Sequence, residues 1–352
     1  MDTIIIRADA STAQGTGHVM RCLALTLALE EHGVAVILAV AECPEALVKR
    51  VEASGAQVER LAVEVGSRED AAATQALARQ SGAGWVVLDG YRFDLAFQRA
   101  LHGGGFKLGL VDDFAHLEGY EVDLVLNQNS HARAEDYPGV PALLLGPSHA
   151  LLRAEFVQAL HALHGRAARS HEGPVQRLLV TMGGSDPGNA TTCILEALGA
   201  LGDGQLETQV LVGAANPHRA AVDAMASGIP GCRVLDPVKD MVPLLEWADL
   251  AVCAGGSTLW EMAAFGVPVA CVILAENQQP IVADLEQRGV VVDLGWDREL
   301  DAERCAKELG SLLADGARRQ RMSELGRRLV DGAGAARVVA ALVEVTGQPA
   351  RR

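Results

Sequence analysis

One histidine stands where a reactive group is expected, at the start of the first predicted helix. His18 follows a Gly-Thr-Gly segment at 15–17, which comes after the apolar run 4–6 and precedes the helix-forming run 23–29. Strand, glycine-rich turn and helix in this order open a doubly wound α/β sheet, whose ligands bind at the carboxyl ends of the strands. Histidine titrates near neutral pH and can act as a general base. We therefore interpret His18 as the reactive group, the alternative being a histidine that only begins the helix.

Polar side chains follow four predicted strands in the first half of the chain, of which the run 123–126 is the last strand predicted there. Because the carboxyl ends of parallel strands meet at one edge of a sheet, we expect these side chains to line a single rim. Carboxylates and amides suit the hydroxyl and acetamido groups of a sugar, although each residue taken singly could instead cap its own loop. The residues concerned are Asp9, Asp89 to Tyr91, Asp112, Asp113 and Asn127 to Asn129.

The second half of the chain repeats the pattern of strand, glycine turn and helix. Gly-Gly-Ser turns at 183–185 and 255–257 each follow an apolar run, and Asn277 and Gln278 follow a third. Glycine lets the backbone approach a ligand closely, and the amides at a helix start favour a phosphate. Two such turns in one doubly wound domain favour a nucleotide. The predicted ligand contacts are Gly184, Ser185, Ser257, Asn277 and Gln278, together with Gly17 in the first half.

Glu261 has two interpretations. Thr258 and Glu261 have the spacing of a capping box, in which the glutamate would bond the backbone at the start of the helix 259–265. The functional interpretation places the same carboxylate in the first turn of that helix, where it could bind a ribose diol. Beside the other glycine turn, Asp186 and Pro187 are predicted to be the N-cap and first residue of a helix over about 188–198.

Charge and cysteine content limit the classes of protein. The chain has 352 residues, 49% of them hydrophobic, a formal net charge of -15 and a pI of about 5.1. This acidic balance argues against a nucleic-acid partner. The 7 scattered cysteines without a CxxC pair suit a reducing cytoplasm, no signal-peptide pattern is present, and no apolar run approaches the ~20 residues of a membrane helix. We expect a cytoplasmic monomer with no membrane partner, no metal and no cofactor.

The length predicts two domains. The first, 1–150, would be a Rossmann-like domain with His18 and the polar rim. The second, 151–352, would be a Rossmann-like nucleotide-binding domain that ends in helices over 303–345. His161, His164 and His171 near the boundary could be taken for a metal cluster. We predict a solvated helix and linker there, because no paired carboxylate supports a metal.

Several motifs, taken together and in order, resemble the UDP-sugar hydrolases of pseudaminic acid biosynthesis. Those in the first half are GTGH at 15–18, DGY at 89–91, DD at 112–113 and NQN at 127–129. Those in the second half are MGGSDP at 182–187, AGGSTLWEMAAFGVP at 254–268, ENQ at 276–278 and DGAGAAR at 331–337. The resemblance covers nearly the whole chain. The second-half motifs are shared with GT-B glycosyltransferases, so the GTGH and DGY motifs are the more specific part.

The resemblance implies an α/β, GT-B-like fold in which two doubly wound Rossmann-type domains face a central cleft, the second domain binding UDP. It implies a partner, a UDP-activated diacetamido sugar, and an enzyme that hydrolyses UDP-2,4-diacetamido-2,4,6-trideoxy-β-L-altropyranose to the free sugar and UDP. Water would attack the anomeric carbon with inversion and without a metal. The catalytic histidine of the family corresponds to His18, and a tyrosine thought to place the water corresponds to Tyr91. The ribose-binding glutamate corresponds to Glu261 and a phosphate-proximal asparagine to Asn277.

Two other functions share these motifs. A GT-B glycosyltransferase would use the same UDP-amino sugar and pass the sugar to an acceptor. A nucleotide-sugar sensor would bind without turnover, and His18 would then be dispensable. The sequence does not fix the stereochemistry of the sugar.

Overall fold

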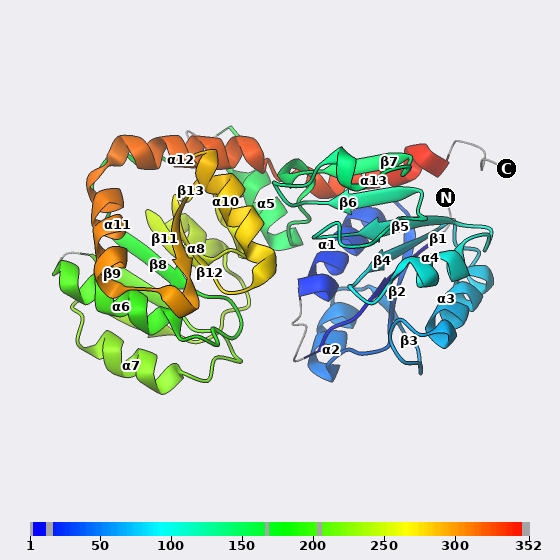
Figure 1. The fold of residues 1–352 in the computed structure, drawn as a ribbon, viewed down its shortest axis with the longest axis horizontal. Helices are drawn as coiled ribbons and strands as arrows, with labels where there is room; N and C mark the ends of the chain where they lie inside the picture. The colour runs from blue at the N-terminus through cyan, green and yellow to red at the C-terminus, as the bar shows by residue number, and fades with distance from the viewer. Residues whose placement is uncertain (1–2, 12–16, 166–168, 203–205, 347–352) are drawn as a thin grey trace. The chain divides into compact units, whose positions relative to one another are not determined.

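The chain folds into two compact units, each built on its own parallel β-sheet (Figure 1). The structure, a computed structural model, describes residues 3–11, 17–165, 169–202 and 206–346. Unit 1 consists of Met1–Val157 and Gly332–Arg352, and unit 2 of Gln158–Asp331. Within the described residues, no helix has the length and apolar character that crossing a membrane requires.

The sheet of unit 1 has seven parallel strands in the order β3-β2-β1-β4-β5-β6-β7. The order reverses at β1, which pairs with β2 on one side and with β4 on the other. A reversal of this kind opens a crevice at the carboxyl ends of the strands. The elements of unit 1 are β1 (Thr3–Ala8), α1 (Gly17–Glu31), β2 (Ala35–Val40), α2 (Glu45–Ala53), β3 (Gln57–Arg60), α3 (Arg68–Gln80), β4 (Trp85–Asp89), α4 (Leu95–Leu101), β5 (Lys107–Val111), β6 (Leu124–Asn127), η1 (Ala134–Asp136), β7 (Ala142–Leu145), η2 (Pro147–His149) and α13 (Gly334–Thr346).

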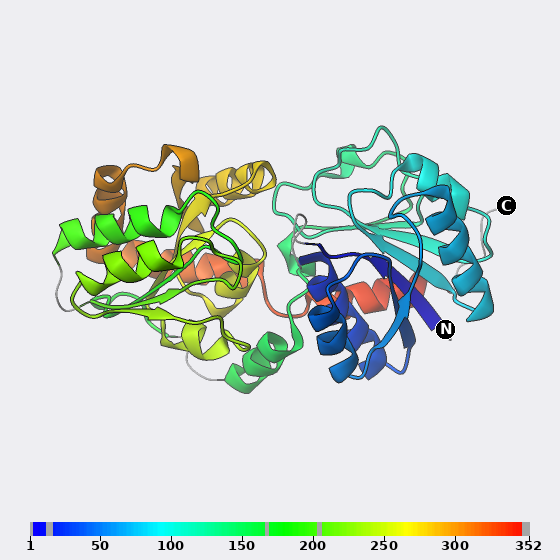
Figure 2. The ribbon, with the colours of Figure 1, turned by 90° about the horizontal axis from the view of Figure 1, so that it is seen from below.

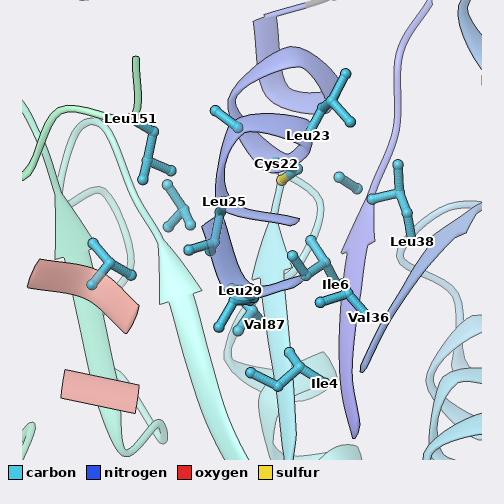
Figure 3. Close-up of a cluster of buried hydrophobic side chains, with 14 of the residues drawn as sticks. Ile4, Ile6, Cys22, Leu23, Leu25, Leu29, Val36, Leu38, Val87 and Leu151 are labelled. Carbon is cyan, nitrogen blue, oxygen red and sulfur yellow. The ribbon is translucent and has the colours of Figure 1, made fainter. Parts of the chain in front are cut away.

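Both faces of this sheet are buried, because successive residues of a strand point to opposite sides. Ile4 and Ile6 of β1 pack with α1, α2 and α13, while Ile5 between them packs with α3 and α4. Figure 3 shows the first face, where Leu25 and Leu29 of α1 lie against Ile4 and Ile6. This packing fixes α1 over β1 and so fixes the position of the helix start.

The C-terminal helix α13 belongs to unit 1, so the prediction that 151–352 forms the second domain is wrong for this segment. Figures 1 and 2 show α13, in red, beside α1. Leu342 is fully buried in the core of unit 1, and its carbonyl accepts a hydrogen bond from Trp85 Nε1 at 3.1 Å. The physical reason is that the apolar stripe of α13 completes the core over β1 and β4. The helices over 303–345 therefore divide between the units, and the boundary after residue 150 moves to 157.

The sheet of unit 2 has six parallel strands in the order β10-β9-β8-β11-β12-β13. The helices α6, α7 and α11 supply side chains to one core beside β8, β9 and β11. The helix α5 (Ala154–Leu163) spans the boundary between the two units. The elements of unit 2 are β8 (Arg177–Thr181), α6 (Ala190–Leu201), β9 (Glu207–Leu211), α7 (Arg219–Ser227), β10 (Cys232–Leu235), α8 (Val242–Trp247), β11 (Leu250–Ala254), α9 (Thr258–Phe265), β12 (Val269–Ile273), η3 (Glu276–Gln278), α10 (Gln279–Gln287), β13 (Val291–Trp296), η4 (Asp297–Glu299), α11 (Ala302–Ala314) and α12 (Gly316–Leu329).

Two local predictions need correction. The strand β7 follows the run that was predicted to be the last strand of the first half, and it pairs with β6 at the sheet edge. The three histidines near the boundary differ from one another: His161 and His164 are exposed as expected, whereas His171 is 4% exposed. Its ring Nδ1 lies 3.1 Å from the carbonyl oxygen of Asp249. His171 therefore serves the packing of unit 2, not a solvated linker.

Candidate active site

The helix α1 carries three side chains on one face that contact the same carboxylate. Gly17 is its first described residue and is exposed, and His18, Arg21 and Cys22 follow at the spacing that brings side chains together on a helix. All three contact Asp89, the last residue of β4. The first two glycine-turn residues of the predicted motif, at 15 and 16, lie outside the described residues. His18 therefore lies at the start of a helix, as predicted, and next to the end of a strand.

His18 and Asp89 form a buried pair. The ring Nδ1 lies 2.6 Å from Asp89 Oδ1, and the two side chains are 7% and 0% exposed. A carboxylate accepts hydrogen bonds, so this contact assigns the proton to Nδ1 and leaves Nε2 as the ring nitrogen that can take up a proton. A histidine oriented in this way by a carboxylate is a suitable general base.

Arg21 joins Asp89 to a second carboxylate. Its Nε donates to Asp89 Oδ2 at 2.7 Å and its Nη2 to Asp89 Oδ1 at 2.6 Å. Its Nη1 donates to Asp113 Oδ1 at 2.7 Å and its Nη2 to Asp113 Oδ2 at 3.0 Å. The Sγ–H of Cys22 adds a further hydrogen bond to Asp89 Oδ2 at 3.2 Å. The two carboxylates are therefore held on either side of one guanidinium.

The charges of this cluster keep both carboxylates ionised. Burial by itself would raise the pKa of Asp89 and Asp113, but the charge of Arg21, its hydrogen bonds to both carboxylates and the proximity of His18 together outweigh burial, and the pKa of each carboxyl lies below its ordinary value. Burial and the charge of Asp89 raise the pKa of the Cys22 thiol, which therefore remains a protonated donor. Two carboxylates and one guanidinium leave the cluster with one net negative charge while His18 is neutral. A proton taken up by His18 would bring that charge to zero.

Tyr91 lies beside His18, as the two motifs predicted. The ring centroids are 4.8 Å apart with an edge-to-face geometry, and the Tyr91 hydroxyl donates to Asp113 Oδ2 at 3.0 Å. Burial, together with the charge of Asp113, raises the pKa of the phenol well above its ordinary value. Tyr91 therefore stays a neutral hydroxyl whose proton is directed at Asp113.

The polar rim exists, because β1, β4, β5 and β6 are adjacent in the sheet. Several of its members cap loops, as the alternative interpretation predicted. Asp9 accepts hydrogen bonds from the amides of Ala41 and Glu42, and Asn127 donates to the Tyr137 hydroxyl. Asn129 Nδ2 donates to the backbone carbonyl of Asp113 at 3.1 Å. Of these rim residues, those around Asp89 and Asp113 lie next to His18.

In unit 2, the glycine turns and the Asn277–Gln278 segment follow β8, β11 and β12, which are neighbours in the sheet. Gly184, Ser185 and Ser257 are exposed, and Asn277 and Gln278 are half-buried. The order of the strands therefore brings these predicted contacts to one edge of the sheet.

Close packing explains the glycine at 255. A Cβ on Gly255 would stand 2.7 Å from Val282 Cγ2 and 3.1 Å from Gln278 Cβ. Gln278 Oε1 accepts the amide of Leu274 at 2.9 Å. Gln278 thus holds the end of β12 and packs against the second glycine turn.

Two helix starts differ from their prediction. The helix α9 begins at Thr258, so Ser257 occupies the N-cap position and Thr258 is not the cap that a capping box with Glu261 requires. Glu261 is buried in the first turn, 7% exposed. The helix α6 begins at Ala190, and Asp186 precedes it with a φ of 44°. Its carboxylate nevertheless accepts the amides of Ala190 and Thr191, because the intervening turn brings it over the helix end.

Arg21 was not among the residues predicted from the sequence. Arg21 could have been found from its spacing, because a residue three positions after His18 on a predicted helix must share a face with it. In the part of the chain that the structure describes, no three side chains of histidine, cysteine, aspartate or glutamate come together as a metal site.

Comparison with known protein families matches residues 178–330 to the glycosyltransferase family 28 C-terminal domain. The UDP-N-acetylglucosamine--N-acetylmuramyl-(pentapeptide) pyrophosphoryl-undecaprenol N-acetylglucosamine transferase of Halorhodospira halophila is 30% identical over 345 residues, which are 91% of this chain and 92% of that protein. The spore coat polysaccharide biosynthesis protein SpsG of Bacillus subtilis is 28% identical over 204 residues, 58% of each chain. Against SpsG and two further curated relatives, the chain spans only 56% to 59% of their length.

A solved structure resembles both units. The crystal structure of Acinetobacter baumannii MurG matches with a TM-score of 0.68 and 15% identity, over 97% of this chain and 99% of that chain. At 15% sequence identity, this structural similarity is evidence of a shared fold alone. The α/β, GT-B-like class with two Rossmann-type domains, expected from the sequence, is confirmed.

Proposed function

This chain belongs to the glycosyltransferase family 28 proteins, and on that ground we propose that it is an enzyme acting at the anomeric carbon of a UDP-activated amino sugar. The observation that carries the proposal is the 2.6 Å contact between His18 Nδ1 and Asp89 Oδ1. It supports His18 as an oriented base next to the carboxyl ends of the strands, where ligands of this fold class bind.

His18 would remove a proton from the attacking oxygen through Nε2. The imidazolium formed in this step is stabilised by Asp89, because the cluster then changes from one net negative charge to none. Arg21 and Cys22 hold Asp89 in place throughout. The C–O bond to the UDP breaks as the new bond forms, so inversion at the anomeric carbon is expected. UDP is a good leaving group, and its departure needs stabilisation of charge more than a strong acid.

We assign binding of the UDP to unit 2. The Gly183–Ser185 turn and the Gly255–Ser257 turn would present amides and hydroxyls to the phosphates. Asn277 would lie near a phosphate, and Glu261 would accept hydrogen bonds from the ribose diol. The convergence of the three strand ends supports this assignment.

Two nucleophiles are possible. Glycosyl transfer to an acceptor hydroxyl is supported by the names of the relatives, among them the N-acetylglucosamine transferase of Halorhodospira halophila. Hydrolysis of UDP-2,4-diacetamido-2,4,6-trideoxy-β-L-altropyranose is supported by one contact within unit 1. His18 and Tyr91, which the GTGH and DGY motifs supply, lie in contact with ring centroids 4.8 Å apart.

An NMR time course tests the proposal and separates the two nucleophiles. The purified chain is mixed with the UDP-diacetamido sugar or with UDP-N-acetylglucosamine, without an acceptor and with EDTA. Free sugar that appears first as the inverted anomer, together with UDP, supports hydrolysis. Consumption only after an acceptor is added supports transfer. UDP-sugars that stay intact under both conditions contradict the proposed function and favour a sensor.

A further inference from the structure

Three aromatic rings beside His18 form an exposed surface in unit 1. The ring centroids of Tyr91 and Phe114 are 5.0 Å apart, those of Phe114 and His116 are 5.8 Å apart, and those of Tyr91 and His116 are 6.3 Å apart. Tyr91 is 39% exposed and Phe114 37%, whereas most large apolar side chains in the described part of the chain are buried. We call these three residues the aromatic platform.

The platform is held in place by its own turn. The carboxylate of Asp112 accepts the amides of Asp113 at 2.7 Å, Phe114 at 3.2 Å and Ala115 at 3.1 Å, and the hydroxyl of Tyr120 at 3.0 Å. Ala115 has a φ of 53°, which residues other than glycine rarely adopt. Four hydrogen bonds to one carboxylate thus maintain an unfavourable backbone conformation, and that conformation sets Phe114 and His116 next to each other. Strained positions maintained in this way are concentrated at functional sites.

The platform is continuous with the reactive pair. Tyr91 contacts His18 edge to face at 4.8 Å, and its hydroxyl is fixed by Asp113. A ligand on the platform would therefore lie beside the base. The rings remain exposed although burial would stabilise them, and adjacent exposed aromatic rings are typical of a binding surface.

We propose that the aromatic platform binds the apolar face of a pyranose ring, with Phe114 and His116 as specificity-determining residues for the sugar. This inference rests on the proposed function, because it makes the bound pyranose the sugar of the substrate. Aromatic faces carry partial negative charge and attract the C–H groups of such a ring. The net negative charge around Asp89 and Asp113 disfavours a phosphate at this position and favours a neutral group. A uracil ring is the competing occupant.

Saturation-transfer NMR on the full chain tests the platform without requiring turnover. The probes are a methyl glycoside of N-acetylglucosamine, as a neutral pyranose, and uridine. We expect the C–H protons on one face of the pyranose to receive saturation. Phe114→Ala should weaken pyranose binding roughly two- to tenfold, and Phe114→Trp should restore it. His116→Ala should weaken binding in the same direction. Val343→Ala, which alters another exposed apolar residue of unit 1 on α13, is the matched control and should change nothing.

The outcomes separate this inference from the proposed function. If UDP-sugar is consumed with the same KM by wild type and Phe114→Ala, and pyranose binding is also unchanged, the platform is not a sugar site although the enzyme is active. If pyranose binding depends on Phe114 while no UDP-sugar is consumed, the platform is a sugar-binding site and the proposed function is wrong. Saturation of the uracil protons that is lost in Phe114→Ala would assign the platform to the nucleobase and overturn the inference.

Discussion

Arg21 holds Asp89 by both carboxylate oxygens, with Nε 2.7 Å from Oδ2 and Nη2 2.6 Å from Oδ1. Asp89 in turn accepts a hydrogen bond from His18 Nδ1–H. The orientation of the His18 ring thus depends on a cation that lies three residues further along the same helix. The remaining nitrogen of the guanidinium is directed at Asp113, so Arg21 also fixes the carboxylate that holds Tyr91.

Loss of the Arg21 charge is expected to destabilise unit 1. Arg21→Met would leave two buried carboxylates without their cation, and removal of one partner of a buried ion pair typically costs about 3–5 kcal/mol. Arg21→Lys keeps the charge but loses the fork that binds both oxygens, so it should lower activity more than stability. Urea unfolding gives the free energy of unfolding. The control is Arg99→Met, because Arg99 pairs with Glu121 on the surface and its loss should cost less than about 1 kcal/mol. Equal effects of the two substitutions would contradict a structural role for Arg21.

The His18–Asp89 pair is expected to govern the chemical step and not the binding of UDP. His18→Ala should lower kcat roughly 10²–10⁴-fold while UDP affinity stays unchanged, since the proposed UDP contacts lie in unit 2. Asp89→Asn should also lower kcat, because an asparagine amide can donate to Nδ1 and so favour the wrong tautomer. Steady-state kinetics and calorimetric titration with UDP measure the two quantities. His32→Ala, an exposed histidine just after α1, should be neutral. Wild-type turnover in His18→Ala would show that another group is the base.

Glu261 is expected to bind the ribose. Glu261→Ala should weaken UDP binding roughly ten- to a hundredfold, because a hydrogen bond to a charged group contributes about 1.5–3 kcal/mol. Glu303→Ala is the matched control, since Glu303 also lies in the first turn of a helix in unit 2. Titration calorimetry with UDP measures both variants. If the two bind UDP equally well, Glu261 has only a structural role at the start of α9.

Acid is expected to destabilise unit 1 through Asp89 and Asp113. The pKa of each carboxyl lies below its ordinary value of 3.8 in the folded chain, where the charge and hydrogen bonds of Arg21 and the proximity of His18 together outweigh the effect of burial. Just below pH 4 the unfolded chain therefore binds more protons than the folded one. The stabilisation is complete above about pH 4 and is lost as pH falls through that value towards the folded pKa. Urea unfolding at about pH 3 and about pH 7 measures this loss, which Asp113→Asn should reduce. If Asp113→Asn leaves the pH dependence of the free energy of unfolding unchanged, the acid sensitivity comes from other groups.

The C-terminal helix α13 is expected to stabilise unit 1 and not unit 2. Leu342→Ala should cost about 2–5 kcal/mol, because Leu342 is fully buried in the core over β1 and β4. Val343→Ala changes the next residue, which is 46% exposed, and should stay within about 0.5 kcal/mol. Hydrogen exchange followed separately in the strands of each sheet measures the effect. Faster exchange in unit 2 instead of unit 1 would contradict the assignment of α13.

Much of the local structure was predictable from residue types. The helix α1 starts beside His18, after the glycine-containing segment, and ends at Glu31 before Gly33, whose φ of 75° lies in the left-handed region typical of a glycine after a helix end. The Gly-Gly-Ser turns stand after β8 and β11 as predicted. The short edge strand β7 was not predicted, because four residues of a strand with one neighbour leave little periodicity to detect.

The sequence by itself determined the two doubly wound units, the position of His18 at a helix start and the polar ends of the strands, since periodicity, glycine turns and strand ends are local features. Only the tertiary structure decided the contacts of Asp89 with His18, 71 residues away, and of Asp113 with Arg21, 92 residues away. It also decided that α13 returns to unit 1. The physical reason is that these contacts depend on which strands become neighbours. Burial of apolar surface across the whole unit selects that order, and no local pattern of residues records it.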